Sequence, residues 1–232
     1  GDTSTLARVE FYAGATKLGE DASAPYSISW TPSSTGAFSL TAVAVTTSGT
    51  TATSAAVSVN VAAAAGSSTP SALTALDIGS PALAGSSTYD SATNTHTVQA
   101  GGQDIWGVSD QFRLVYGEVA GDAELVVRVQ SIGATDGWAK AGLMLRESTA
   151  ANARHVSVFV TPSFGVALQW RSATGGESST TGAGGAAPIW LRLRRSGNTF
   201  SGAFSSDGAT WTTIGQTSLA LPSGLIGGLA VT

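Results

Sequence analysis

Residues 138–146 read Trp-Ala-Lys-Ala-Gly-Leu-Met-Leu-Arg and alternate between two kinds of side chain. Neighbouring side chains of a β-strand point to opposite faces, so the alanines and leucines would share one face. Lys140, Met144 and Arg146 would share the other. A solvated strand face usually carries short polar side chains. Two long cations and a thioether beside Trp138 therefore predict a shaped surface that contacts a ligand.

The same alternation recurs on both sides of this stretch. Strands are expected at residues 95–100, 111–118, 123–132, 139–147, 154–161, 166–173, 189–195, 199–206, 211–218 and 224–231. Turn signals such as Gly197-Asn198 and Asp207-Gly208 separate them, and no convincing helix interrupts the series. Such a series predicts a large two-sheet antiparallel sandwich over residues 73–232.

The N-terminal quarter of the chain has shorter alternating strands, expected at residues 7–12, 26–30, 36–46 and 52–61. They predict a small antiparallel sandwich with Trp30 in its core. Residues 62–72 are small and polar, contain Gly66 and Pro70 and carry no apolar anchor, which is typical of a linker. The predicted organisation is therefore a domain over 1–61, a linker over 62–72 and a domain over 73–232.

Composition narrows the function classes. Charged residues make up 11% of the 232 residues, less than half of the roughly 25% usual in soluble domains. A surface of Ser, Thr, Ala and Gly suits a secreted bacterial protein. Cysteine is absent, which excludes disulfides, thiolate metal sites and cysteine nucleophiles. The arginines are dispersed along strands, which argues against nucleic-acid binding, and no apolar run reaches the roughly 18 residues of a membrane span.

The N-terminal strands carry a family resemblance. The residues concerned are the strand at 7–12, Lys17-Leu18-Gly19, the segment 25–30 and the strand at 37–45. This pattern resembles the bacterial Ig-like repeats of secreted multidomain proteins. An Ig-like repeat has one or two strands before the strand that corresponds to residues 8–12, and only seven residues precede Arg8 here. We therefore expect an Ig-like domain that is incomplete at its N-terminus.

A series of spaced positions runs through residues 73–232. It comprises Asp77-Ile78-Gly79, Pro81, Tyr89-Asp90, Asp104-Ile105-Trp106-Gly107, Asp110-Gln111-Phe112, Trp138 to Gly142, Met144, Arg146-Glu147, Thr161-Pro162, Gln169, Arg171 and Ser206-Asp207-Gly208. The series resembles the concanavalin A-like jelly-roll modules, related to laminin G domains, of secreted bacterial glycan-active enzymes and adhesins. The resemblance implies a jelly-roll sandwich that recognises carbohydrate and is usually non-catalytic. The family pattern has a further strand after 225–231, so we expect a C-terminally incomplete domain.

The candidate site combines polar side chains of neighbouring strands with two loop tryptophans. The predicted carbohydrate-binding residues are Trp106, Trp138, Lys140, Arg146, His155, Gln169 and Arg171, and Arg128, Gln130, Arg192 and Arg194 are further outward-facing candidates. Aromatic faces would stack on sugars while amides and cations bind hydroxyls or a uronate carboxylate. Alternatively, the polar side chains pair with Glu124, Glu147 or Asp136 on a solvated face, and the two tryptophans plug the end of the sandwich. Trp170, Trp190 and Trp211 are expected in cores or cross-strand pairs.

Other chemistries have weak signals. The only histidines, His96 and His155, lack metal-ligand spacing. Residues 89–94 and 103–110 supply oxygens, and laminin G-like relatives commonly hold structural calcium, but EF-hand spacing is absent. The Glu-x-Asp-x-x-Glu strand of jelly-roll glycosidases is also absent, and a retaining glycosidase needs two facing carboxylates. We therefore expect no catalytic residues, no metal site and no required cofactor.

Three functions follow from these patterns. The leading one is a non-catalytic carbohydrate-binding or adhesive module with an Ig-like spacer, part of a larger secreted protein at the cell surface. The alternative is a structural repeat of an extracellular filament or giant adhesin, in which strands from neighbouring domains or subunits cover an exposed edge strand at each terminus. A glycan-cleaving enzyme is the third.

Overall fold

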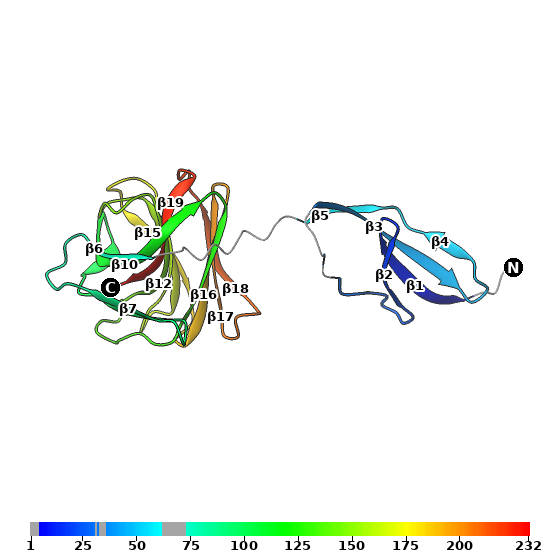
Figure 1. Ribbon diagram of the computed structural model, residues 1–232, viewed down its shortest axis with the longest axis horizontal. Helices are drawn as coiled ribbons and strands as arrows, with labels where there is room; N and C mark the ends of the chain where they lie inside the picture. The colour runs from blue at the N-terminus through cyan, green and yellow to red at the C-terminus, as the bar shows by residue number, and fades with distance from the viewer. Residues whose placement is uncertain (1–4, 31, 33–35, 62–72) are drawn as a thin grey trace. The chain divides into compact units, whose positions relative to one another are not determined.

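The computed structural model describes residues 5–30, 32, 36–61 and 73–232, and in these residues every regular element is a β-strand. The chain divides into two compact units, Gly1–Ala64 and Ala65–Thr232, which are coloured blue to cyan and cyan to red (Figure 1). The predicted linker over 62–72 lies outside the described residues. Antiparallel sheets in a sandwich-like arrangement confirm the all-β prediction.

The smaller unit is one five-stranded antiparallel sheet. Its strands are β1 (Leu6–Ala13), β2 (Thr16–Asp21), β3 (Gly36–Thr46), β4 (Thr51–Thr53) and β5 (Val57–Val61), in the order β2-β1-β3-β4, with β5 also paired to β3. The predicted strand over 26–30 is wrong. The backbone N–H of Ser27 donates to the carboxylate of Asp21 at 2.9 Å and not to a neighbouring strand. Trp30 is half-buried and packs edge-on against Phe38.

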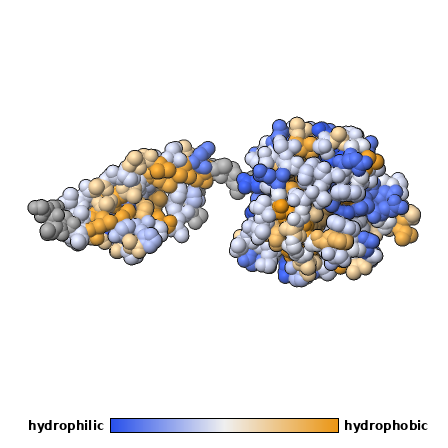
Figure 2. Space-filling model, turned by 180° about the vertical axis from the view of Figure 1, so that it is seen from behind, coloured by the Kyte–Doolittle hydropathy of each residue, from blue (hydrophilic) through white to orange (hydrophobic). Residues whose placement is uncertain are grey.

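Apolar burial in the smaller unit is limited. Among its described residues, Val45 is the only buried hydrophobic side chain, and orange apolar patches reach its surface (Figure 2). A charged cluster accompanies them: Glu10 accepts hydrogen bonds from Tyr12 at 2.7 Å and Lys17 at 2.9 Å. These bonds, together with one from Arg8, lower the pKa of Glu10 to about 2.

The larger unit is a sandwich of two sheets with an added hairpin. One sheet has eight strands in the order β15-β14-β13-β12-β19-β10-β6, with β9 paired to β10, and the other has the order β11-β16-β17-β18. The first sheet contains β6 (Thr74–Ile78), β9 (Asp104–Trp106), β10 (Ser109–Ala120), β12 (Ala141–Arg146), β13 (His155–Val160), β14 (Val166–Arg171), β15 (Ser178–Ala183) and β19 (Gly224–Val231). The second contains β11 (Ala123–Val129), β16 (Ile189–Ser196), β17 (Thr199–Ser205) and β18 (Thr212–Ser218), and the hairpin is β7 (Ser86–Asp90) and β8 (Thr95–Gln99).

The first and last strands of the described residues are both paired on two sides. β1 lies between β2 and β3, and β19 lies between β10 and β12. The expectation of an exposed edge strand at each terminus is therefore wrong. Because β19 lies inside the sheet, its backbone N–H and C=O groups are hydrogen-bonded to β10 and β12.

The central strands of the eight-stranded sheet are buried on both faces. One face packs on the four-stranded sheet through a core that includes Leu143, Leu145, Val158, Leu168, Leu191 and Phe200. Trp170 packs against this core, as predicted. The other face carries a second core of Ile78, Ile105, Phe112, Leu114, Met144, Phe159 and Ala230. Both faces of β12 and β13 are buried along their full length, so the face expected to contact a ligand is interior at these two strands.

Candidate functional site

The strand register brings the predicted polar residues together in two rows on one face. Arg146, His155 and Arg171 are direct neighbours across β12, β13 and β14. Met144, Ser157 and Gln169 form the next row, which Thr180 of β15 extends. Lys140 precedes β12 and continues its alternation. The predicted shared face is therefore present, although its row of cations does not reach solvent.

Residues 104–111 cover this face. β9 and the start of β10 form a hairpin, with Trp106 opposite Ser109 and Ile105 opposite Asp110. Ile105 anchors the hairpin because its side chain is fully buried in the second core. Asp110 is also fully buried, and its backbone N–H donates to the carbonyl of Ala151 at 2.9 Å. The hairpin thus forms a roof over β13 and β14.

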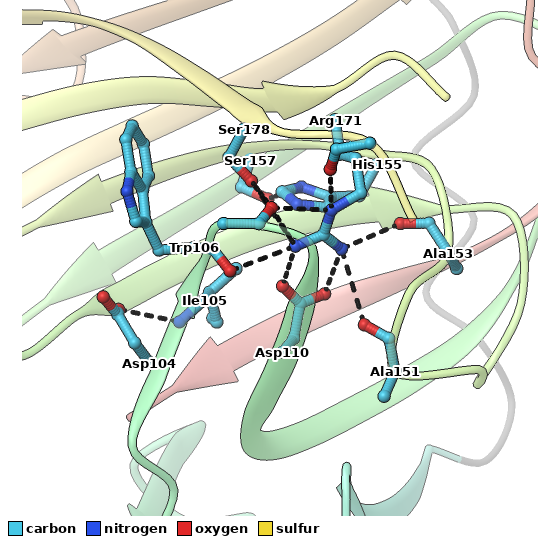
Figure 3. Close-up of polar contacts among 12 residues, drawn as sticks. Asp104, Ile105, Trp106, Asp110, Ala151, Ala153, His155, Ser157, Arg171 and Ser178 are labelled. Carbon is cyan, nitrogen blue, oxygen red and sulfur yellow. Dashed lines mark hydrogen bonds and ion pairs between the residues drawn. The ribbon is translucent and has the colours of Figure 1, made fainter. Parts of the chain in front are cut away.

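Arg171 binds this roof to the sheet. Its Nη1 donates to Oδ2 of Asp110 at 2.8 Å and its Nη2 to Oδ1 at 2.5 Å, a two-pronged ion pair. It also donates to the carbonyl of Gly107 at 3.1 Å and to that of Ala153 at 3.1 Å. Figure 3 shows these bonds converging on one guanidinium, with the Trp106 ring directed away from it. The Nε, Nη1 and Nη2 atoms of Arg171 all donate hydrogen bonds to groups within the protein.

Arg146 shares the same carboxylate more distantly. Its Nη1 lies 3.4 Å from Oδ2 of Asp110, and it donates to the carbonyls of Ser148 at 2.6 Å and Ala150 at 2.5 Å. Burial lowers the pKa of Arg146 to about 10, so the guanidinium stays protonated at neutral pH. The two buried cations are balanced by one carboxylate and a set of backbone carbonyls, and neither is available to a ligand.

His155 lies between the two arginines. It is fully buried, and its Nδ1 is 3.0 Å from the hydroxyl of Ser157. Its Nε2 has no hydrogen-bond partner among the described residues. Burial, together with the positive charges of Arg146 and Arg171, holds the pKa of His155 well below its usual value. The imidazole is therefore neutral and belongs to the buried network.

A cleft opens beside the roof, and four of the seven predicted residues line it. Its volume is about 320 Å³, and its lining consists of Asp104, Trp106, Trp138, Lys140, Gln169 and Thr180. Of the predicted set, Trp106, Trp138, Lys140 and Gln169 thus meet in one place. Arg146, His155 and Arg171 lie in the buried network, which is a correction to their predicted role on the surface. The hairpin at residues 104–111 covers them.

Two exposed aromatic rings belong to the cleft. Trp106 is 40% exposed and Trp138 is 43% exposed, and they come from the roof hairpin and from the loop before β12. Trp138 is held by a hydrogen bond from its backbone N–H to Asp136 at 2.7 Å and by stacking on Phe164, with ring centroids 4.1 Å apart and planes 13° apart. Phe164 was missed by sequence reasoning. An exposed aromatic between Ser163 and Gly165 in a turn was the available signal.

The polar groups of the cleft are only partly satisfied. Lys140, which is 2% exposed, forms an ion pair and a short hydrogen bond with Oδ1 of Asp104. The backbone N–H of Ile105 donates to the same Oδ1 at 2.7 Å. Gln169 is buried, yet its Oε1 has no hydrogen-bond partner among the described residues. A buried unpaired amide oxygen costs about 1–3 kcal/mol, which a donor bound in the cleft would recover.

The remaining candidates lie elsewhere. Arg128, Arg192 and Arg194 are in β11 and β16 of the other sheet, and the guanidinium of Arg192 lies 4.3 Å from the ring centroid of Trp211. Gln130 follows β11 and is exposed. Of the expected surface partners, Glu147 pairs with Arg154 at 2.9 Å, not with Arg146. Arg128, Arg192 and Arg194 therefore belong to the second sheet and do not line the cleft.

The oxygen-rich loops use their carboxylates within the protein. Asp90 accepts from the backbone of Ala92 at 2.9 Å and from the hydroxyl of Thr93 at 2.8 Å. Across the described ranges, no three His, Asp or Glu side chains gather as a metal-binding group would. No helix in these ranges is long and apolar enough to cross a membrane.

Comparison with known proteins gives a family match for the N-terminal residues and only structural similarities for the rest of the chain. Residues 1–42 match the family model described as a bacterial Ig domain, in agreement with the Ig-like prediction for this segment. No curated protein matches the chain. A functionally unknown protein from Saccharomyces cerevisiae is similar in structure, with a TM-score of 0.53 and 20% identity over 69% of this chain and 86% of the yeast chain. This similarity concerns the fold alone.

Two structures of the GH43 protein BlXynB from Bacillus licheniformis are more distant. The mutant protein has a TM-score of 0.37 and 12% identity over 99% of this chain and 61% of that chain. The other has a TM-score of 0.34 and 11% identity over 98% of this chain and 60% of that chain. This chain thus spans less than two thirds of either. The concanavalin A-like assignment of the larger unit stays a prediction.

Proposed function

We propose that the larger unit is a non-catalytic carbohydrate-binding module whose ligand lies in the cleft beside the β9–β10 hairpin. The observation that carries this proposal is Gln169. Its side chain lines the cleft, and its amide oxygen is buried and lacks a partner among the described residues. Sugar hydroxyls are donors and acceptors at once, so a hydroxyl can supply the missing hydrogen bond.

The aromatic rings supply the second half of sugar recognition. Trp106 and Trp138 expose rigid faces at the cleft, and the apolar C–H face of a sugar ring covers such a surface while its hydroxyls stay hydrogen-bonded. Stacking on Phe164 fixes the plane of Trp138 before a ligand arrives. A platform that is already ordered loses little side-chain entropy on binding.

The carboxylates of the cleft support binding without cleavage. Asp104 is the only acidic residue that lines the cleft among the described residues, and it is paired with Lys140. A glycosidase of either stereochemistry needs two carboxyl groups on opposite sides of the bond, about 5–5.5 Å apart for retention or about 6.5–9.5 Å apart for inversion. Asp110 is close in sequence but is sealed in the core by Arg171.

The N-terminal residues support the setting of this module. The match to a bacterial Ig domain over residues 1–42 and the low content of charged residues support a secreted bacterial protein in which the smaller unit is a spacer. The binding module then attaches a larger protein to a polysaccharide outside the cell.

The test is binding of the full chain to a panel of plant, algal and microbial polysaccharides by affinity electrophoresis. We expect retardation by at least one of them, and Trp138→Ala should weaken that binding about tenfold, equal to about 1.4 kcal/mol, with an unchanged melting temperature. Trp211→Ala is the matched control, because Trp211 directly precedes β18 and packs against Arg192 of the other sheet, and this variant should bind as the parent does. No retardation by any polysaccharide would refute the proposal.

A further inference from the structure

The ionic groups around the cleft are paired with one another inside the protein. Three cations lie on the polar face, and each has its charge committed within the protein. Arg171 is held by the carboxylate of Asp110, Arg146 by Asp110 and two backbone carbonyls, and Lys140 by Asp104. An anionic sugar therefore finds no free cation on this face, within the part of the chain that the structure describes.

In the ion pair between Lys140 and Asp104 at the cleft, the negatively charged residue is the exposed one. The side chain of Asp104 is 41% exposed, whereas that of Lys140 is 2% exposed. Among the described residues, both hydrogen bonds to the Asp104 side chain fall on Oδ1, which leaves Oδ2 as a free acceptor on a partly exposed side chain that lines the cleft. A carboxylate accepts hydroxyl hydrogens and repels another carboxylate.

We infer that the cleft selects uncharged polysaccharides and excludes polyuronates, with Asp104 as the residue that sets this preference. Gln169 and Oδ2 of Asp104 bind hydroxyls of a neutral sugar whose face lies on Trp106 or Trp138. A uronate carboxylate at the same position meets Oδ2 first and reaches the Lys140 ammonium only by displacing its partner. This inference rests on the proposed function and narrows its ligand.

The experiment compares one polysaccharide with and without charge. The panel of neutral and acidic polysaccharides is first used to find a ligand. The neutral glycan that binds is then oxidised at its primary hydroxyls to the uronate, or an acidic glycan that binds is reduced to the neutral sugar. We expect the neutral form to bind the full chain about tenfold more tightly than the charged form, because two carboxylates at contact distance repel each other.

Two variants assign the preference to Asp104. Asp104→Asn keeps the shape and frees the Lys140 ammonium, so binding to the charged form should rise about tenfold and become sensitive to salt. Lys140→Met leaves Asp104 unpaired and should keep the exclusion of the charged form, which tests the same idea if Asp104→Asn does not fold. Glu124→Gln, on the other sheet, removes one negative charge far from the cleft and should change neither affinity.

The outcomes separate this inference from the proposed function. Tighter binding of the charged form by the parent chain would overturn the neutral preference and leave the carbohydrate-binding proposal standing. Equal binding of both forms, or an unchanged preference in Asp104→Asn, would remove the role of Asp104. If no glycan of either charge binds, the proposed function itself fails.

Discussion

At the scale of single residues, Asp110 is the side chain on which the buried network depends. It is fully buried and is the only carboxylate that Arg146 and Arg171 contact in the described residues. Breaking a buried ion pair from one side leaves an uncompensated charge, and this costs more than the net contribution of the pair. The alternation of residues 138–146 predicted which face Arg146 occupies, but no local signal in the sequence linked it to Asp110, 36 residues earlier.

Replacing Asp110 by Ala should destabilise the larger unit by about 3–5 kcal/mol, because two guanidiniums would remain buried without a counter-charge. Urea unfolding followed by circular dichroism measures this change. Glu147→Ala breaks the partly exposed pair with Arg154 and should cost less than about 1 kcal/mol. A loss for Asp110→Ala as small as that of the control would mean that the network adds little stability.

The pH dependence of stability should report His155. Its pKa in the folded state is well below the usual value, so the unfolded chain binds a proton near pH 6.5 that the folded chain does not bind. The contribution is fully present above about pH 6.5 and is lost as pH falls towards the folded pKa, by up to about 1.4 kcal/mol per pH unit.

Urea unfolding of the parent chain between pH 7 and pH 5 measures this slope, and His155→Gln should reduce it. His96→Gln is the control, since His96 is half-buried and its pKa is lowered by burial alone, without neighbouring arginines. A parent slope that His155→Gln leaves unchanged would show that other groups control acid stability.

At the scale of elements, the β9–β10 hairpin decides what the cleft contains. It places Asp104 and Trp106 at the cleft, and it covers the arginine row that the sequence pattern exposes. Sequence periodicity shows which residues of a strand share a face. It does not show what lies over that face, because the covering segment follows a short irregular stretch and contacts the face through only a few side chains, among them Ile105 and Asp110.

Ile105→Ala should therefore affect both stability and binding. Removal of a fully buried isoleucine side chain costs about 2–5 kcal/mol, and the loss of this anchor should loosen Trp106, with a red shift of tryptophan fluorescence and weaker retention on the polysaccharide. Val108→Ala in the same hairpin removes an exposed side chain and should leave all three readouts unchanged. Unaltered binding by Ile105→Ala would show that polysaccharide binding does not depend on Ile105.

At the scale of the whole molecule, the two units differ in how much apolar surface they bury. Val45 is the one buried hydrophobic side chain among the described residues of the smaller unit, whereas the larger unit has two extended cores. Buried apolar area is the main favourable term in folding. We expect the smaller unit to be the less stable.

Hydrogen exchange during urea unfolding should show this difference. Amides of β1 and β3 should lose protection at a lower urea concentration than those of β12 and β13, which are covered on both faces. Simultaneous loss of protection in both units would show that they unfold as one cooperative body.

The sequence alone determined the all-β class and which residues of β12, β13 and β14 share a face, because period-two alternation is a local property of the chain. It also predicted that Trp106, Trp138, Lys140 and Gln169 belong to the same site. Only the tertiary structure decided that these four line a cleft while Arg146, His155 and Arg171 are sealed in a network. That division depends on Asp110 and Ile105, which reach the sheet face from a hairpin outside the strands that the pattern describes, and burial by a distant segment leaves no trace in local alternation.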